Sequence, residues 1–118
     1  MSRVLVVEDE AHLAQGLRFN LEAEGYSAEI VGDGEAATER LLDKKENFDA
    51  IVLDIMLPGM NGLELAQAIR SRWPAHIIAM SASARMLDRA EKEPCVDKAM
   101  AKPFDWDVLM EDLREAVA

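Results

Sequence analysis

The chain has 118 residues, of which 50% are hydrophobic, which is enough for one compact domain over residues 1–118 with a core of its own. Its 13 basic and 23 acidic residues give a net charge of −10 without a basic cluster, which argues against direct nucleic-acid binding. The first apolar run, residues 4–7, is too short for a secretory signal or a membrane span, so no membrane partner is expected. The single cysteine, Cys95, cannot form an internal disulfide, and we expect a cytoplasmic protein.

Three strands are predicted in the first half of the chain, at residues 4–7, 26–31 and 50–53. The first and third are short apolar runs typical of buried strands, and the second alternates polar and apolar residues as an edge strand does. A helix is expected over residues 10–24, where leucines recur on one face and Gly25 suits the position after the end. Asp33 and Gly34 lead into a second helix.

The second half continues the alternation of strands and helices. Two turn signals, Pro58-Gly59 and Asn61-Gly62, follow the third strand and precede a third helix. The remaining elements are strands at residues 77–80 and 98–101 and helices at 84–93 and from 105 to the C-terminus. Parallel strands need helical crossovers, so this order predicts an α/β fold with a doubly wound parallel sheet and helices on both faces.

Polar residues stand where four of the predicted strands end: Glu8 and Asp9, then Asp54, Ser81 and Lys102. Ligands of open α/β sheets bind at the carboxyl ends of the strands, so these side chains are expected to meet. Three carboxylates repel one another unless a cation neutralises them, and a hard divalent cation such as Mg²⁺ prefers oxygen ligands. One carboxylate is then placed to attack phosphorus, while the metal and Lys102 stabilise charge on the transferred group. Ser81 is expected to donate a hydrogen bond to a phosphoryl oxygen.

Four pieces of sequence, in order and over essentially the whole chain, resemble the receiver domain of two-component response regulators. They are Val-Val-Glu8-Asp9-Glu10, Asp54-Ile-Met-Leu-Pro58-Gly-Met-Asn-Gly62, Met80-Ser81-Ala82 and Ala101-Lys102-Pro103-Phe104. The resemblance implies a flavodoxin-like (βα)5 three-layer sandwich whose parallel five-stranded sheet has the strand order 2-1-3-4-5. It also implies a cis peptide bond between Lys102 and Pro103.

At the site, the resemblance implies that Asp54 is the phosphoacceptor and that Ser81 and Lys102 contact the phosphoryl group. It implies Mg²⁺ as cofactor, with Mn²⁺ or Ca²⁺ as substitutes in vitro. The metal ligands would be Asp9, Asp54 and the backbone carbonyl of Met56, with Glu8 holding a metal-bound water. Such a domain is a signalling phosphoacceptor and not an enzyme, because it catalyses only its own phosphorylation and dephosphorylation.

The partners implied are a sensor histidine kinase or histidine phosphotransfer protein, which donates from a phosphohistidine, and a downstream output protein or domain. The oligomeric state is left open, with a weak dimer through the face between the fourth and fifth helices as the form to consider. Two positions depart from the usual pattern. Glu8 replaces the commoner aspartate, and Ala99 stands where many receivers carry the Tyr or Phe that moves on phosphorylation.

Other interpretations stay open at this point. A flavodoxin-like cofactor binder needs a glycine- and hydroxyl-rich first loop, where this chain has Glu-Asp-Glu. An aspartyl phosphohydrolase usually has an acid two residues after its nucleophile, where Met56 stands. A degenerate receiver would act as an unphosphorylated protein-interaction module.

For several single residues, purely structural roles also stay open. Glu8 or Asp9 would serve as a helix cap. His12 and His76 are expected at the surface, with no carboxylate or cysteine at metal-ligand spacing to recruit them. Cys95 is expected to pack in the fold or lie near a loop, and Trp106 to be half-buried.

Overall fold

The computed structural model describes residues 2–72 and 74–117, and within them strands and helices alternate. The main sheet consists of β1 (Arg3–Val7), β2 (Ser27–Val31), β3 (Ala50–Asp54), β6 (His76–Ser81) and β7 (Lys98–Ala101). The helices are α1 (Ala11–Ala23), α2 (Gly34–Thr38), α3 (Gly62–Arg70), α4 (Ala84–Glu91) and α5 (Trp106–Val117). Two short strands, β4 (Met56–Leu57) and β5 (Met60–Asn61), pair as an antiparallel hairpin. In these described segments, no helix has the length and apolar character needed to cross a membrane.

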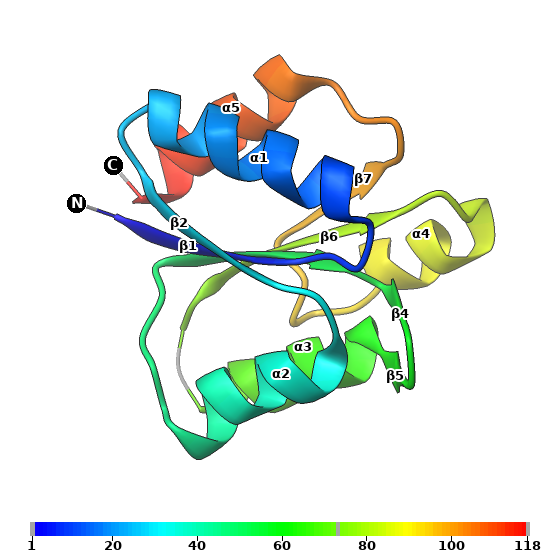
Figure 1. Ribbon diagram of the computed structural model, residues 1–118. Coiled ribbons are helices and arrows are strands. Elements are labelled where there is room, and N and C mark those ends of the chain that lie inside the picture. Colours follow the sequence, from blue (N-terminus) through cyan, green and yellow to red (C-terminus); the bar gives the residue numbers. More distant parts are fainter. Residues whose placement is uncertain (1, 73, 118) are drawn as a thin grey trace.

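The five-stranded sheet of the described chain is parallel throughout, with the order β2-β1-β3-β6-β7. When the small hairpin is left out of the numbering, this is the expected order 2-1-3-4-5. Figure 1 shows α1 and α5 on one face of the sheet and α2 and α3 on the other. Helix α4 packs against β6 and β7. The predicted doubly wound three-layer fold is therefore confirmed.

The side chains of β1 show why its sequence is apolar at every position. Val4 and Val6 belong to the core beneath α1 and α5, whereas Leu5 and Val7 belong to the core beneath α2 and α3. All four side chains are fully buried, because helices cover both faces of the strand. The polar residue that follows, Glu8, therefore lies where the strand leaves the core.

The structure decides three details of the connections between strands that the sequence left open or did not predict. Helix α1 is capped by Glu10, whose carboxylate accepts the N–H groups of His12 and Leu13, so neither Glu8 nor Asp9 serves as the cap. The second helix widens into a π-helical turn, η1 (Glu39–Asp43), in which Arg40 pairs with glutamates of two neighbouring segments. The hairpin of β4 and β5 was not predicted, because its four paired residues give no periodic signal.

His76 is a correction to the sequence prediction. Its side chain is half-buried, with Nε2 2.7 Å from Oδ2 of Asp112 and Nδ1 3.7 Å from Oδ2 of Asp97. Helix α5 returns across the start of β6 and supplies a carboxylate 36 positions away, which no local spacing reveals. The other expectations hold: His12 is exposed, Cys95 is buried as a free thiol and Trp106 is half-buried beside Phe104.

A glycine is required where helix α3 begins, because the backbone after β3 approaches it closely. A Cβ atom on Gly62 would lie 2.6 Å from the carbonyl oxygen of Asp54 and 2.7 Å from Cα of Ile55. Gly16, within α1, has open space at the same place. The two glycines thus offer a matched pair of substitutions.

We predict that Gly62→Ala lowers the free energy of unfolding by about 1–3 kcal/mol, because backbone atoms cannot move aside. Gly16→Ala should raise it by about 0.5–1 kcal/mol, since alanine is the better helix former. Urea unfolding followed by circular dichroism measures both values. Similar changes for the two variants would contradict the close approach at Gly62.

Candidate functional site

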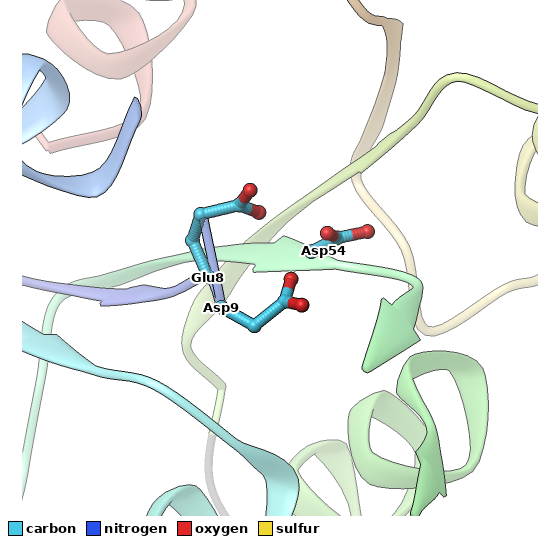
Figure 2. A group of neighbouring side chains, drawn as sticks. All are labelled: Glu8, Asp9 and Asp54. Atoms are coloured by element: carbon cyan, nitrogen blue, oxygen red, sulfur yellow. The ribbon is translucent and has the colours of Figure 1, made fainter. Parts of the chain in front are cut away.

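The carboxyl ends of β1, β3, β6 and β7 bring the predicted site residues to one edge of the sheet. Glu8 and Asp9 follow β1, Asp54 and Ser81 end β3 and β6, and Lys102 follows β7. One carboxylate oxygen from each of Glu8, Asp9 and Asp54 lies within 4.8 Å of the other two. Figure 2 shows Glu8 and Asp9 reaching from the turn after β1 toward Asp54. The sequence prediction that these carboxylates meet is therefore reproduced by the fold.

The ammonium group of Lys102 lies between two of these carboxylates. Its Nζ atom is 2.9 Å from both carboxylate oxygens of Glu8 and 2.9 Å from Oδ2 of Asp54. The Glu8 side chain is fully buried, and the Lys102 side chain is 19% exposed. The Lys102 backbone N–H donates to the carbonyl of Ser81 at 3.0 Å, and its peptide bond to Pro103 is cis as expected. Lys102 therefore supplies a countercharge from within the protein.

Burial controls the protonation of this pair. It raises the pKa of Glu8 from 4.5 to about 7. The hydrogen bond from Lys102 lowers this pKa in part, whereas the neighbouring Asp54 raises it further. For Lys102, burial by itself lowers the pKa, but its bonds to Glu8 and Asp54 outweigh this and leave the pKa above its ordinary value. The single ammonium does not balance the charge of three carboxylates. The cluster therefore keeps excess negative charge, which favours the approach of a further cation.

Backbone groups complete the surroundings of Asp54 and Ser81. The Met56 N–H donates to Oδ1 of Asp54 at 3.0 Å, so each Asp54 oxygen has a donor. The Ser83 N–H donates to Oγ of Ser81 at 3.0 Å, which leaves the hydroxyl hydrogen free to point elsewhere. Sequence reasoning missed these two N–H donors, because every residue except proline carries one and only the turn decides where it points.

The ligand atoms of this site fit a hard divalent cation. All three carboxylates offer oxygen, the ligand type that Mg²⁺, Mn²⁺ and Ca²⁺ prefer. Asp9 is exposed and lines a hollow of about 670 Å³ together with Met56, Met60 and Glu64, so a hydrated ion can reach the cluster. The Glu8, Asp9 and Asp54 group is accordingly one that could bind a divalent metal. The role of the Met56 carbonyl stays a prediction.

The family model of the response regulator receiver domain matches residues 4–114. The chain belongs to this family. Response regulator ArlR of Staphylococcus epidermidis is 36% identical over 115 residues, which cover 97% of this chain and 52% of ArlR. The chain thus spans about half the length of the curated relatives it matches.

Solved receiver structures share the fold over nearly the whole chain. Response regulator TrrA of Thermotoga maritima has a TM-score of 0.87 and 32% identity, covering 99% of this chain and 100% of TrrA. Chemotaxis protein CheY4 of Vibrio cholerae has a TM-score of 0.84 and 25% identity, covering 99% of each chain. Membership of a signalling family favours the receiver interpretation over a flavodoxin-like cofactor binder or an aspartyl phosphohydrolase.

The raised pKa of Glu8 leads to a pH-dependent prediction for the metal-free receiver domain. The pKa of Glu8 is about 7 in the folded protein and 4.5 in the unfolded chain. The folding stability that results from this difference is fully present below pH 4.5 and is lost as the pH rises through 7. Glu8→Gln stays neutral, so at pH 8 it should exceed the native protein in stability by on the order of 1 kcal/mol, with a smaller difference at pH 5.

Urea unfolding in the presence of a chelator, at pH 5 and pH 8, measures this difference. Glu64→Gln serves as the control, because Glu64 is an exposed carboxylate beside the same hollow and its loss should change stability by less than about 0.5 kcal/mol. A Glu8→Gln protein less stable than the native one at pH 8 would show that Lys102 outweighs the cost of burial.

Proposed function

We propose that this receiver domain accepts a phosphoryl group on Asp54 from a phosphohistidine of a sensor kinase or histidine phosphotransfer protein. The observation that carries the proposal is the position of the Asp54 carboxylate, held between the Lys102 ammonium and the Met56 N–H at the end of a central strand. A nucleophilic carboxylate must be oriented, and these two donors orient it. The TrrA relative supports it, since that protein was solved in complex with Mg(2+)-BeF.

In the proposed reaction, a carboxylate oxygen of Asp54 attacks phosphorus. A phosphorus–oxygen bond forms while the phosphorus–nitrogen bond to the donor histidine breaks, and the electron pair stays on the imidazole nitrogen. Lys102 is placed to hold a phosphoryl oxygen, because its ammonium already lies 2.9 Å from Asp54. Ser81, whose hydroxyl hydrogen is not needed by Ser83, donates to another phosphoryl oxygen.

The proposed cofactor is Mg²⁺, with Asp9, Asp54 and the Met56 carbonyl as ligands and Glu8 holding a metal-bound water. When bound, the metal neutralises the carboxylates and the charge on the transferred phosphoryl oxygens. The exposed Asp9 and the hollow beside it support this assignment, since they give the ion a route to the cluster.

The output of the complete protein belongs to the proposal as well, because the ArlR relatives are about twice as long as this chain. We propose a downstream output protein or domain and a cytoplasmic location. The oligomeric state is left open, with a weak dimer through α4 and α5 as the form to consider. The net charge of −10 supports a protein partner over nucleic acid for this domain.

Phosphorylation is tested with a small donor such as acetyl phosphate, read by intact mass. We expect a mass increase of one phosphoryl group that requires Mg²⁺ and disappears in the presence of a chelator. Asp54→Asn should abolish it, and Lys102→Ala should slow it by roughly tenfold or more, since it removes charge stabilisation.

Circular dichroism spectra of the variants control for folding. Labelling that persists in folded Asp54→Asn would move the acceptor to another residue. A native protein that is never labelled, with or without Mg²⁺, would instead support the degenerate receiver.

Signal transmission is proposed to run through the start of α4, because Ala99 is too small to act as a rotamer switch. Ala99 is half-buried beside Ala79, Ala90 and Leu63, and a methyl group has no rotamers to exchange. Ser81 Oγ instead accepts the N–H of Ser83, and Ser83 Oγ accepts the N–H of Met86. If the Ser81 Oγ atom itself shifts toward a phosphoryl group when it donates, the Ser83 N–H loses its acceptor and the cap of α4 is disturbed.

We predict that phosphorylation changes amide hydrogen exchange in residues 81–91 more than in the strand around Ala99. The measurement compares protein with and without acetyl phosphate and Mg²⁺, and Asp54→Asn treated in the same way is the control. Changes confined to residues 98–101, with α4 unaffected, would disprove this route.

A further inference from the structure

An exposed methionine stands two positions after the proposed phosphoacceptor in the chain. The Met56 side chain is 60% exposed, two residues after Asp54, and its own N–H donates to Oδ1 of Asp54. It lines the hollow that also contains Asp9 and Glu64. A residue with most of its surface in solvent, in a hollow shared with Asp9, is open to an oxidant in solution.

The other methionines of the described segments are less exposed than Met56. Three have at most 7% of their surface exposed, namely Met80, Met100 and Met110. Met60 packs against Gly34, and the Thr38 hydroxyl lies 3.8 Å from its sulfur. Met86 is half-buried against the cluster that includes Ile55. Exposure therefore singles out Met56 for oxidation.

The thiol does not compete with it. Cys95 is buried, and this burial raises its pKa to about 11, so very little reactive thiolate exists at neutral pH. Peroxide is a two-electron oxidant that is attacked by a lone pair on sulfur, and the neutral thioether of Met56 is more accessible to it than the Cys95 thiol.

We propose that Met56 is a peroxide-sensitive modification site and that its sulfoxide weakens phosphoryl-group binding at Asp54. Hydrogen peroxide transfers one oxygen atom to the Met56 sulfur: the oxygen–oxygen bond breaks, a sulfur–oxygen bond forms, and the peroxide leaves as water. Sulfur is oxidised by two electrons and the peroxide is reduced by the same two.

The effect on the site, which rests on the proposed function, follows from charge. A sulfoxide oxygen carries partial negative charge and accepts hydrogen bonds but donates none. It joins a hollow that already holds Asp9 and Glu64 and a cluster with excess carboxylate. A bound phosphoryl group is anionic, so the added oxygen repels it and draws water toward it. Peroxide would thereby reduce the response of the domain to its phosphodonor.

The first measurement maps oxidation after graded exposure to hydrogen peroxide, by fragment-ion mass spectrometry of peptides. We expect the Met56 sulfoxide to form several times faster than that of Met60 or Met86. Faster oxidation of either of those two residues would overturn the proposal.

The second measurement is calorimetric titration with Mg²⁺ and beryllium fluoride, an anionic complex of phosphoryl-like shape, before and after peroxide. Affinity should fall at least about threefold on oxidation. Met56→Leu lacks the sulfur, so its affinity before and after peroxide should agree, whatever its starting value. Met86→Leu keeps Met56 and should lose affinity as the native protein does.

The outcomes separate the two proposals. Unoxidised protein that fails to bind Mg²⁺ and beryllium fluoride removes the proposed function and, with it, the effect of the sulfoxide. Unoxidised protein that binds, but with an affinity unchanged after Met56 is fully oxidised, overturns only the inference about Met56. A loss of affinity that persists in Met56→Leu assigns the effect to another residue.

Discussion

The ammonium group of Lys102, 2.9 Å from the carboxylates of Glu8 and Asp54, is the interaction on which the site depends. Glu8 is 1% exposed and Asp54 5%, and two such carboxylates side by side are costly without a cation. Lys102 makes the arrangement tolerable, yet a single ammonium faces two carboxylates, so negative charge remains. A site in this condition is suited to bind a cation and then an anion.

The strand order determines how this interaction is made. Strands β1 and β3 are neighbours, so Glu8 and Asp54 follow paired positions and meet directly. Strand β6 lies between β3 and β7, so Lys102 must reach past the end of β6 to touch them. Ser81, a small residue, stands at that end, and its carbonyl holds the Lys102 backbone. The long side chain of Lys102 after the edge strand and the small side chain of Ser81 at the end of the neighbouring strand thus fit together.

The loops then orient the parts that the strands bring together. The Met56 N–H holds one oxygen of Asp54, and the bare Gly62 lets α3 begin against the backbone of the same turn. Ser83 connects the Ser81 hydroxyl to the first turn of α4. Ser81 and the helix proposed to respond to phosphorylation are therefore joined by two hydrogen bonds and not by an aromatic side chain.

The sequence by itself determined the alternation of strands and helices, the sheet that follows from it and the meeting of Glu8, Asp9 and Asp54. These features depend on periodicity and on which residue ends a strand, and both are local. The Glu10 cap, the π-helical turn at Arg40 and the pairing of His76 with Asp112 were decided only by the tertiary structure.

The same holds for the protonation of the site and for the accessibility of its neighbours. The sequence shows that carboxylates gather, but Glu8 and not Asp9 is the buried one, and only the packed fold decides this. Likewise, seven methionines look alike in the sequence, whereas Met56 alone among those described has most of its surface in solvent. Burial is set by segments far apart in the chain that pack together, and for that reason local sequence patterns do not reveal it.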